Sequence, residues 1–213
     1  MIILFDLDGT LIDSTEAILE GFHYSFDVYK HSQPSDEEIK ALIGYPLDVM
    51  YRELGVKSSL ISEFVRVYKE YYRVISCEKT FLLEDAKEAV FLASTIAEIG
   101  IVTTKTGLYS EIIMENFGLM EYFKVLIGRE HVQNPKPHAE PILKALESFD
   151  TTNKEIWMIG DTKLDLLSAT NAGVKSIGVL SGYGSQSSLE EHTSVVLKDA
   201  LEAIKYLQDK KKR

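Results

Sequence analysis

The sequence contains little cysteine and proline and no long hydrophobic run. Its 213 residues include one cysteine, Cys77, and five prolines, so no intrachain disulfide can form and nothing indicates an oxidising compartment. The apolar start at residues 1–5 meets two carboxylates by residue 8, which is too short for the core of a signal peptide. The uncharged stretches are also too short to span a membrane. We therefore expect a cytoplasmic protein with no membrane partner.

Basic residues are also in the minority. The chain has 23 Lys and Arg residues against 33 Asp and Glu residues, which gives a formal net charge of −10. A charge of this sign opposes binding to the nucleic-acid backbone, so we expect no nucleic-acid partner. We interpret the basic residues 210–213 as a solvated helix end. The length suits one large domain, or a core domain that carries a smaller insertion.

Short apolar runs alternate with helical patterns over most of the chain. Runs rich in Ile and Val suit strands that are covered on both faces, and apolar residues three and four apart predict helices between them. This alternation predicts an α/β fold with a Rossmann-like parallel sheet core and helices on both faces. Gly118 and Gly173 stand where two of these helices should end. The expected strands are 2–5, 98–103, 125–127, 156–159 and 176–179, and the expected helices are 83–93, 110–117, 141–149 and 164–172.

Residues 14–80 interrupt this alternation. The segment contains no convincing strand. A connection between parallel strands needs only about a dozen residues, so the segment is too long to be a simple crossover. We expect a small all-helical domain at 14–80, inserted into an α/β core formed by 1–13 and 81–213. Its expected helices are 14–30, one that starts at the capping-box sequence Ser35-Asp36-Glu37-Glu38, 46–54 and 59–75.

An aspartate pair directly follows the first expected strand. The alternation of side chains along an extended chain predicts that Asp6 and Asp8 point to the same side. Parallel strands bring their carboxyl ends to the ligand crevice of an open sheet, so both carboxylates are expected there. Taken alone, Asp8-Gly9 is also typical of an ordinary turn.

A second aspartate pair follows the fourth expected strand. Asp161 stands at the strand end, and Asp165 lies one helical turn further on. Each could serve only the helix, with Asp161 or Thr162 as its N-cap and Asp165 as an acid in its first turn. That interpretation does not explain why two separate strand ends carry acid pairs. Four carboxylates converging in one crevice, from Asp6, Asp8, Asp161 and Asp165, predict a divalent cation with oxygen ligands, most simply Mg²⁺.

Two further segments carry groups that suit a phosphate. Thr103 and Thr104 end the second expected strand and can donate hydrogen bonds to phosphate oxygens, although threonine at a strand end is usually structural. Lys136 stands between Pro135 and Pro137, which restrict the backbone and therefore the direction of the ammonium group. A lysine that points at the acid cluster can pair with both an aspartate and a phosphate. The alternative is an ordinary solvated loop lysine.

Taken together, these segments resemble the haloacid dehalogenase superfamily. Its members carry Asp-x-Asp-Gly-Thr after the first strand, Thr or Ser after the second, then a Lys, and Gly-Asp-x-x-x-Asp after the fourth. The resemblance covers almost the whole chain, and the helical block at 14–80 stands where this family has a cap domain. The run 178–184 is similar to a stretch of the phosphoglycolate phosphatase-like branch. The matching positions are Asp6, Asp8, Thr103, Lys136, Asp161 and Asp165.

The resemblance implies hydrolysis of a small phosphate monoester through an aspartyl-phosphate, with a small phosphorylated metabolite as the substrate. Asp6 would be the nucleophile. Asp8 would protonate the leaving alkoxide and then take a proton from the hydrolytic water. Thr103, Thr104 and Lys136 would bind the phosphate and stabilise charge on it during the transfer.

The resemblance also implies a Mg²⁺ site and a role for the cap. Asp6, the main-chain carbonyl of Asp8 and Asp161 would hold the metal, and Asp165 would orient Lys136 or metal-bound water. The cap would close over the crevice and select the substrate. Tyr45 lies between two cap helices and is our candidate for contact with the leaving group, although it could equally be a packing residue.

Several activities remain open on this fold. Family members that cleave carbon–halogen or carbon–phosphorus bonds lack a carboxylate at the position of Asp8, so these two reactions drop out. A phosphoglycolate phosphatase-like activity is favoured, and a phosphosugar mutase, a pyrophosphatase and a catalytically silent regulator are the alternatives. Thr104 replaces the Asn that is usual in the branch, which weakens assignment to one substrate. We expect a monomer or a weak homodimer.

Overall fold

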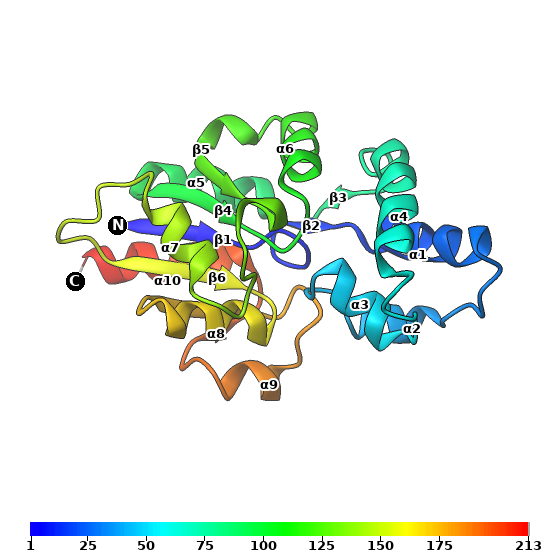
Figure 1. Ribbon diagram of the computed structural model, residues 1–213. Coiled ribbons are helices and arrows are strands. Elements are labelled where there is room, and N and C mark those ends of the chain that lie inside the picture. Colours follow the sequence, from blue (N-terminus) through cyan, green and yellow to red (C-terminus); the bar gives the residue numbers. More distant parts are fainter. Residues whose placement is uncertain (213) are drawn as a thin grey trace.

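A six-stranded parallel sheet lies at the centre of the protein (Figure 1). The computed structural model describes residues 1–212, so residue 213, the last of the basic end and of the predicted core, lies outside the described part. The strands follow the order β5-β4-β1-β6-β7-β8, and each is parallel to its neighbours. The predicted α/β fold is therefore confirmed. The strands are β1 (Ile2–Phe5), β4 (Glu98–Val102), β5 (Phe123–Ile127), β6 (Ile156–Gly160), β7 (Lys175–Val179) and β8 (Val196–Leu197).

Helices connect these strands, and four of them lie where the sequence predicts helices. Gly118 and Gly173 adopt positive φ angles of 66° and 70° just after two of the helices, as expected for glycines that end helices. The strand β8 and the helix α9 were not predicted, because two and five residues are too few to show a period. The helices of the core are α5 (Ala86–Ile96), α6 (Gly107–Asn116), α7 (Glu140–Leu146), α8 (Lys163–Asn171), α9 (Gln186–Glu190) and α10 (Ala200–Lys212), with the short 3-10 helices η1 (Met120–Tyr122) and η2 (Arg129–His131).

Both faces of the sheet are buried, because helices cover each face and side chains alternate between the two along each strand. Ile3 and Phe5 of β1 pack into the layer that contains α5, α6 and α10. Ile2 and Leu4 pack into the opposite layer, which contains α7 and α8. All four side chains are fully buried, which explains why the strand reads as a continuous apolar run.

Four helices that follow the first strand form the cap, at one end of the sheet (Figure 1). They fall within the predicted segment 14–80, and Ser35 and Glu38 form the predicted capping box. The short strands β2 (Ile12–Asp13) and β3 (Phe81–Leu82) pair antiparallel where the chain enters and leaves the cap. The cap helices are α1 (Thr15–Val28), α2 (Asp36–Lys40), α3 (Leu47–Glu53) and α4 (Ile61–Ile75).

Aromatic side chains fill the interior of the cap. Phe26 of α1, Tyr51 of α3 and Phe64 of α4 are fully buried. The ring centroid of Phe64 lies 5.2 Å from that of Phe26 and 5.4 Å from that of Tyr51, in edge-to-face arrangements that aromatic quadrupoles favour. The hydroxyls of Tyr51 and Ser25 are hydrogen-bonded at 2.7 Å, so the polar end of the buried tyrosine is satisfied. The cap therefore holds its helices together by its own packed interior.

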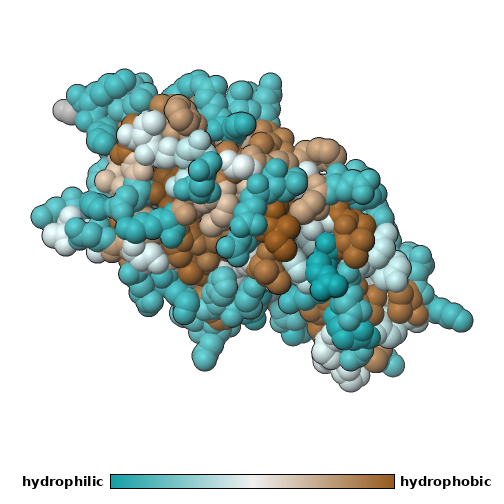
Figure 2. Space-filling view, turned by 90° about the horizontal axis from the view of Figure 1, so that it is seen from above, coloured by the Kyte–Doolittle hydropathy of each residue, from teal (hydrophilic) through white to brown (hydrophobic). Residues whose placement is uncertain are grey.

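One face of the molecule shows how polar and apolar side chains are distributed at the surface. Figure 2 shows hydrophobic side chains in small groups among hydrophilic ones on one face of the molecule. Val74 on α4 is the most exposed large hydrophobic side chain of the described residues, at 75%. Within residues 1–212, no helix has the length and apolarity that crossing a membrane requires.

Truncation of Phe64 should destabilise the protein strongly, because it leaves a cavity among the aromatic rings of the cap. We expect Phe64→Ala to lower the free energy of unfolding by about 3–5 kcal/mol. Val74→Ala on the same helix removes an exposed side chain and should change it by less than about 0.5 kcal/mol. Denaturant unfolding of both variants measures the difference. Equal effects of the two substitutions would show that the cap does not depend on this packing.

Candidate active site

The carboxyl ends of three neighbouring strands bring the main polar groups together. β1 lies between β4 and β6 in the sheet. Asp6 directly follows β1, Thr103 follows β4 and Asp161 follows β6. The chain passes from β1 to strands on one side and then returns to strands on the other, so the order reverses beside β1 and leaves a crevice at this edge. All three residues are buried: Asp6 is 5% exposed, Thr103 is 4% exposed and Asp161 is 0% exposed.

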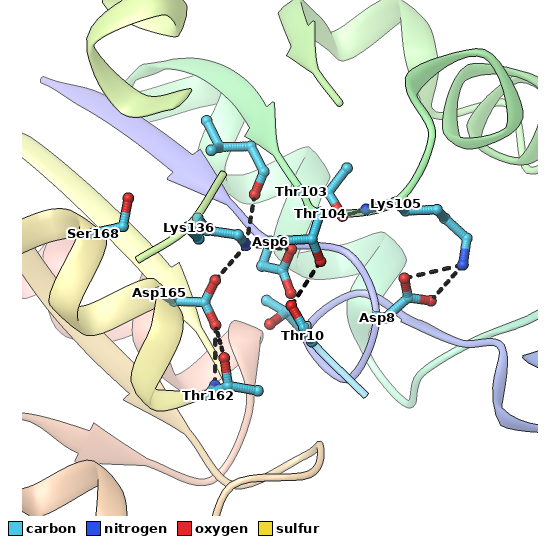
Figure 3. A network of polar contacts seen from close by, with 12 residues as sticks. Asp6, Asp8, Thr10, Thr103, Thr104, Lys105, Lys136, Thr162, Asp165 and Ser168 are labelled. Atoms are coloured by element: carbon cyan, nitrogen blue, oxygen red, sulfur yellow. Dashed lines mark hydrogen bonds and ion pairs between the residues drawn. The ribbon is translucent and has the colours of Figure 1, made fainter. Parts of the chain in front are cut away.

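Lys136 links two of the aspartates (Figure 3). Its Nζ donates to Asp6 Oδ1 at 2.8 Å, to Asp165 Oδ1 at 2.5 Å and to the carbonyl of Val102 at 3.1 Å. Asp165 Oδ2 accepts from both the backbone N–H and the hydroxyl of Thr162, at 3.0 Å and 2.7 Å. Both oxygens of Asp165 are thus engaged. Its contacts suit a residue that positions Lys136 and caps α8 at the same time.

Asp161 is enclosed by backbone and hydroxyl donors. Its Oδ1 accepts from the hydroxyl of Thr10 at 3.1 Å, and its Oδ2 accepts from the backbone N–H of Tyr183 at 2.8 Å. A Cβ atom at Gly9 or Gly182 would overlap the Asp161 carboxylate, so both positions need glycine for this close approach. The glycine-rich stretch around Tyr183 therefore holds an aspartate in place. The sequence alone assigned no such task to it or to Thr10.

Burial and mutual repulsion make the two aspartates at the strand ends hard to ionise. Burial raises the pKa of Asp6 to about 7, with Lys136 acting in the opposite direction and Asp165 and Asp8 adding to the rise. Burial, followed by the charges of Asp165 and Asp6, raises the pKa of Asp161 well above its ordinary value. Burial by itself lowers the pKa of Lys136, but Asp165 and Asp6 outweigh it and raise that pKa. The cluster therefore favours a further cation.

Three of the carboxylates fit a divalent metal ion. One oxygen from each of Asp6, Asp161 and Asp165 lies within 4.8 Å of the others, and all three residues are buried. Lys136 is the one ammonium group that contacts this set within residues 1–212, so negative charge remains in excess. Carboxylate oxygens around a site with excess negative charge are the donor set that Mg²⁺ prefers. The chemistry of the residues thus suits the expected metal.

The side chain of Asp8 does not join this set. The expectation that four carboxylates converge was therefore wrong for Asp8. Lys105 Nζ lies 3.0 Å from each of its oxygens (Figure 3). The Ser14 hydroxyl donates to one of these oxygens. The expectation assumed that extended alternation continues past Phe5. The strand ends at Phe5, and the carbonyl of Leu7 accepts from the backbone N–H groups of Thr10 and Leu11, so the chain already turns at Asp8 and the alternation does not continue. The sequence did not identify Lys105 as the partner of Asp8, and the only signal for it was its position directly after Thr103 and Thr104.

The two threonines have different environments. Thr103 is buried, and its hydroxyl oxygen accepts a hydrogen bond from the backbone N–H of Lys105 at 3.2 Å. It follows Val102, whose carbonyl accepts a hydrogen bond from Lys136, so the chain brings it to the Asp6 and Lys136 cluster. The hydroxyl of Thr104 donates to the carbonyl of Gly44 in the cap at 2.8 Å. In this arrangement Thr104 joins core to cap, and its hydroxyl hydrogen is not directed at the crevice.

A cavity of about 330 Å³ lies between cap and core beside Asp8. Its wall includes Asp8, Thr104 and Lys105 from the core and Tyr45 and Tyr72 from the cap. Tyr45 is half-buried and also packs against the hydrophobic core. The structure therefore places Tyr45 both at the cavity and in the packing, and its contact with a substrate stays a prediction.

The fold and this cluster define a class of enzyme. Buried aspartates and a lysine meet at the carboxyl edge of a parallel sheet, beside a helical cap, and such a polar cluster at the crevice of an open sheet indicates an active site. A family model described as haloacid dehalogenase-like hydrolase matches residues 3–179. The chain therefore belongs to the haloacid dehalogenase-like hydrolases, the family that its sequence resembles.

Similar proteins support this assignment. The pyrophosphatase PpaX of Bacillus cereus (strain G9842) is 33% identical over 178 residues, which cover 83% of this chain and 82% of that protein. A haloacid dehalogenase-like family hydrolase from Streptococcus pneumoniae superposes with a TM-score of 0.86 at 28% identity over 97% of both chains. A predicted phosphoglycolate phosphatase from Haemophilus somnus superposes with a TM-score of 0.87 at 23% identity, again over 97% of both chains, and shows the shared fold.

The raised pKa of Asp6 should be visible in the stability of the metal-free protein. A pKa of about 7 against an ordinary value of 3.8 means that the folded protein holds this proton to a higher pH than the unfolded chain. Between about pH 4 and pH 7 the Asp6 contribution therefore lowers the free energy of unfolding as the pH rises, by up to about 1.4 kcal/mol per pH unit. Above pH 7 the contribution is constant.

Asp6→Asn removes this titration while keeping the shape of the side chain. We expect the stability of the variant relative to wild type to increase from pH 4 to pH 7 and then to level off. Denaturant unfolding in EDTA at several pH values measures it. A difference in the free energy of unfolding between variant and wild type that is the same at every pH would contradict the raised pKa of Asp6.

Proposed function

We propose that this phosphatase hydrolyses small phosphate monoesters with Mg²⁺ through an aspartyl-phosphate on Asp6. One observation carries the proposal. Asp6 lies at the carboxyl edge of the sheet, bonded to Lys136 at 2.8 Å and within reach of the carboxylates of Asp161 and Asp165. An anionic nucleophile can approach an anionic phosphate only where cations offset the repulsion. Lys136 is one such cation, and the carboxylates suit a divalent metal ion as a second.

In the first step, an oxygen of Asp6 attacks phosphorus and the bond from phosphorus to the leaving oxygen breaks. Asp8 gives a proton to that leaving oxygen. In the second step, Asp8 takes a proton from water as the water oxygen attacks phosphorus, and the bond from phosphorus to Asp6 breaks. Inorganic phosphate and the free Asp6 carboxylate result, so both residues return to their starting forms.

The remaining residues stabilise charge. Lys136 would hold both Asp6 and a phosphate oxygen, and Thr103 would donate its hydroxyl hydrogen to another. Asp6, the main-chain carbonyl of Asp8 and Asp161 are the proposed metal ligands. Bound there, Mg²⁺ would reduce the repulsion between the nucleophile and the phosphate dianion. Asp165 would act through Lys136, to which it is bonded.

The substrate is a small phosphorylated metabolite of the cytoplasm in this proposal, and the enzyme acts as a monomer or weak homodimer. A phosphoglycolate phosphatase-like activity is the monoester candidate, and hydrolysis of pyrophosphate, an anhydride, is the alternative. The 33% identity to a protein named as the pyrophosphatase PpaX favours the second. The run 178–184, similar to the phosphoglycolate phosphatase-like branch, favours the first. The complete residue set argues against a silent regulator, and a mutase would have to protect the phosphorylated enzyme from water.

Replacement of Asp8 should trap the phosphorylated enzyme. An aryl phosphate needs little protonation of its leaving group, so Asp8→Asn should still be phosphorylated on Asp6, while the loss of the base slows attack by water. We expect an adduct of one phosphoryl group in intact-mass analysis after acid quench. Asp6→Asn is the matched control and should show neither adduct nor turnover. An adduct that never forms in Asp8→Asn would remove the two-step mechanism.

Mg²⁺ should stabilise the folded protein through the aspartate cluster. A ligand that binds only the folded state adds about 2.7 kcal/mol at one hundred times its Kd. We expect the melting temperature of the wild type to rise with millimolar Mg²⁺ and that of Asp161→Asn to rise much less. Asp209→Asn changes an exposed aspartate on α10 and should respond like the wild type. A wild-type melting temperature that ignores Mg²⁺ would contradict the metal site.

A further inference from the structure

The cavity between cap and core is lined largely by apolar side chains. Three helices of the cap contribute aliphatic groups to its wall, and tyrosine rings from both cap and core add aromatic surface. Pockets that bind small molecules have this composition, with apolar walls and a few polar groups that fix orientation. The cavity therefore suits a ligand with an apolar body. The aliphatic residues from these helices are Ile18, Leu47, Met50 and Val65.

The cavity is also large compared with the leaving groups of the two candidate activities. Its volume is about 330 Å³. In another protein, a cavity of about 150 Å³ lined by aliphatic and aromatic side chains accommodates benzene. The space beside Asp8 is about twice that volume. A two-carbon leaving group or a single phosphoryl group would leave most of this cavity unfilled by the substrate.

The charged groups of the wall provide no excess of positive charge. Asp8 and Lys105 form an ion pair at 3.0 Å, and the Arg129 guanidinium donates to the backbone carbonyl of Val132 at 3.0 Å. The wall contains three carboxylates and three cationic groups, so an anionic leaving group gains no net attraction from it. An uncharged apolar group enters it without losing a hydration shell that the wall must replace. The charged residues are Asp8, Asp48, Glu130, Lys69, Lys105 and Arg129.

Asp8 connects this cavity with the proposed chemistry. In the proposed function the phosphate lies at Asp6 and Lys136, and Asp8 protonates the oxygen that leaves phosphorus. That oxygen must come within hydrogen-bond reach of the Asp8 carboxylate. Because Asp8 belongs to the cavity wall, the group that the oxygen carries is directed into the cavity.

We propose that the substrate is a phosphate monoester whose leaving group has an uncharged, apolar body at least as large as a six-membered ring. Transfer of this body from water into the apolar cavity supplies the preference. The inference rests on the proposed phosphatase activity and narrows its substrate class. It ranks such esters above phosphoglycolate and above pyrophosphate, whose leaving groups are small and anionic.

Four esters of primary alcohols separate apolar character from size and charge. Ethyl phosphate and 2-phenylethyl phosphate differ by one apolar ring. Glucose 6-phosphate carries a polar body of similar size, and phosphoglycolate carries a small anionic one. With Mg²⁺, we expect wild-type kcat/KM for 2-phenylethyl phosphate to be at least about tenfold higher than for ethyl phosphate, because the ring is buried in the cavity. It should also exceed the values for glucose 6-phosphate and phosphoglycolate.

Val65→Phe narrows the cavity from α4. We expect kcat/KM for 2-phenylethyl phosphate to fall about tenfold or more, and that for ethyl phosphate to change less than about threefold, because only the larger ester needs the lost space. Val74→Phe is the matched control on the same helix, at a side chain that is 75% exposed, and should leave the ratio of the two unchanged.

Leu47→Ala widens the cavity from α3 and provides the decisive comparison where Val65→Phe does not fold. We expect the ratio of kcat/KM for 2-(1-naphthyl)ethyl phosphate to that for 2-phenylethyl phosphate to rise about fivefold or more, because the second ring gains space. An unchanged ratio in this variant would show that Leu47 does not border the leaving group, and the proposed use of the cavity would then be wrong.

The outcomes separate the two proposals. A wild type that hydrolyses ethyl phosphate and 2-phenylethyl phosphate equally well, or that prefers glucose 6-phosphate or phosphoglycolate, overturns the apolar leaving group and leaves the phosphatase proposal standing. An equal loss of activity toward the small and the large ester in Val65→Phe also overturns it, because the substitution then acts on something common to both. A wild type that hydrolyses none of the four esters contradicts the proposed function itself.

Discussion

The buried contact of Lys136 with Asp6 and Asp165 is the constraint on which the site depends. It joins a loop residue to the end of β1 and to the first turn of α8, so three segments far apart in the sequence share one ammonium group. Each charge would be costly to bury alone. The excess of carboxylates over ammonium groups explains both the raised pKa values of Asp6 and Asp161 and the fit to a divalent cation.

A second buried ion pair divides the crevice into two parts. Lys105 pairs with the carboxylate of Asp8 at the cavity between cap and core, apart from the cluster of Asp6, Asp161 and Asp165. The nucleophile candidate and the acid–base candidate are thus two residues apart in sequence but have different cationic partners. Such separation suits a pair of carboxylates with different tasks, since each environment can be set independently.

The cap adds a boundary that the core cannot supply. Its aromatic interior holds four helices together, and the Thr104 hydrogen bond to Gly44 fixes one point at which cap and core meet. Tyr45 lines the cavity from the connection between α2 and α3, and Tyr72 lines it from α4. The residues proposed for phosphate chemistry lie outside the cap, and the cap supplies only part of the wall of the cavity beside them.

The sequence by itself determined the α/β class, the helical insertion and the strand ends that carry Asp6, Thr103 and Asp161. These follow from local patterns, since apolar runs, helical periodicity and chain order need no knowledge of distant contacts. The family resemblance added roles for Lys136 and Asp165, but their mutual contact is a tertiary fact. Only the folded structure decided that Asp8 turns to Lys105 and that the stretch around Tyr183 encloses Asp161. The physical reason is that partners of buried charges and hydroxyls come from segments tens to more than a hundred residues apart, and no periodicity along the chain encodes such pairings.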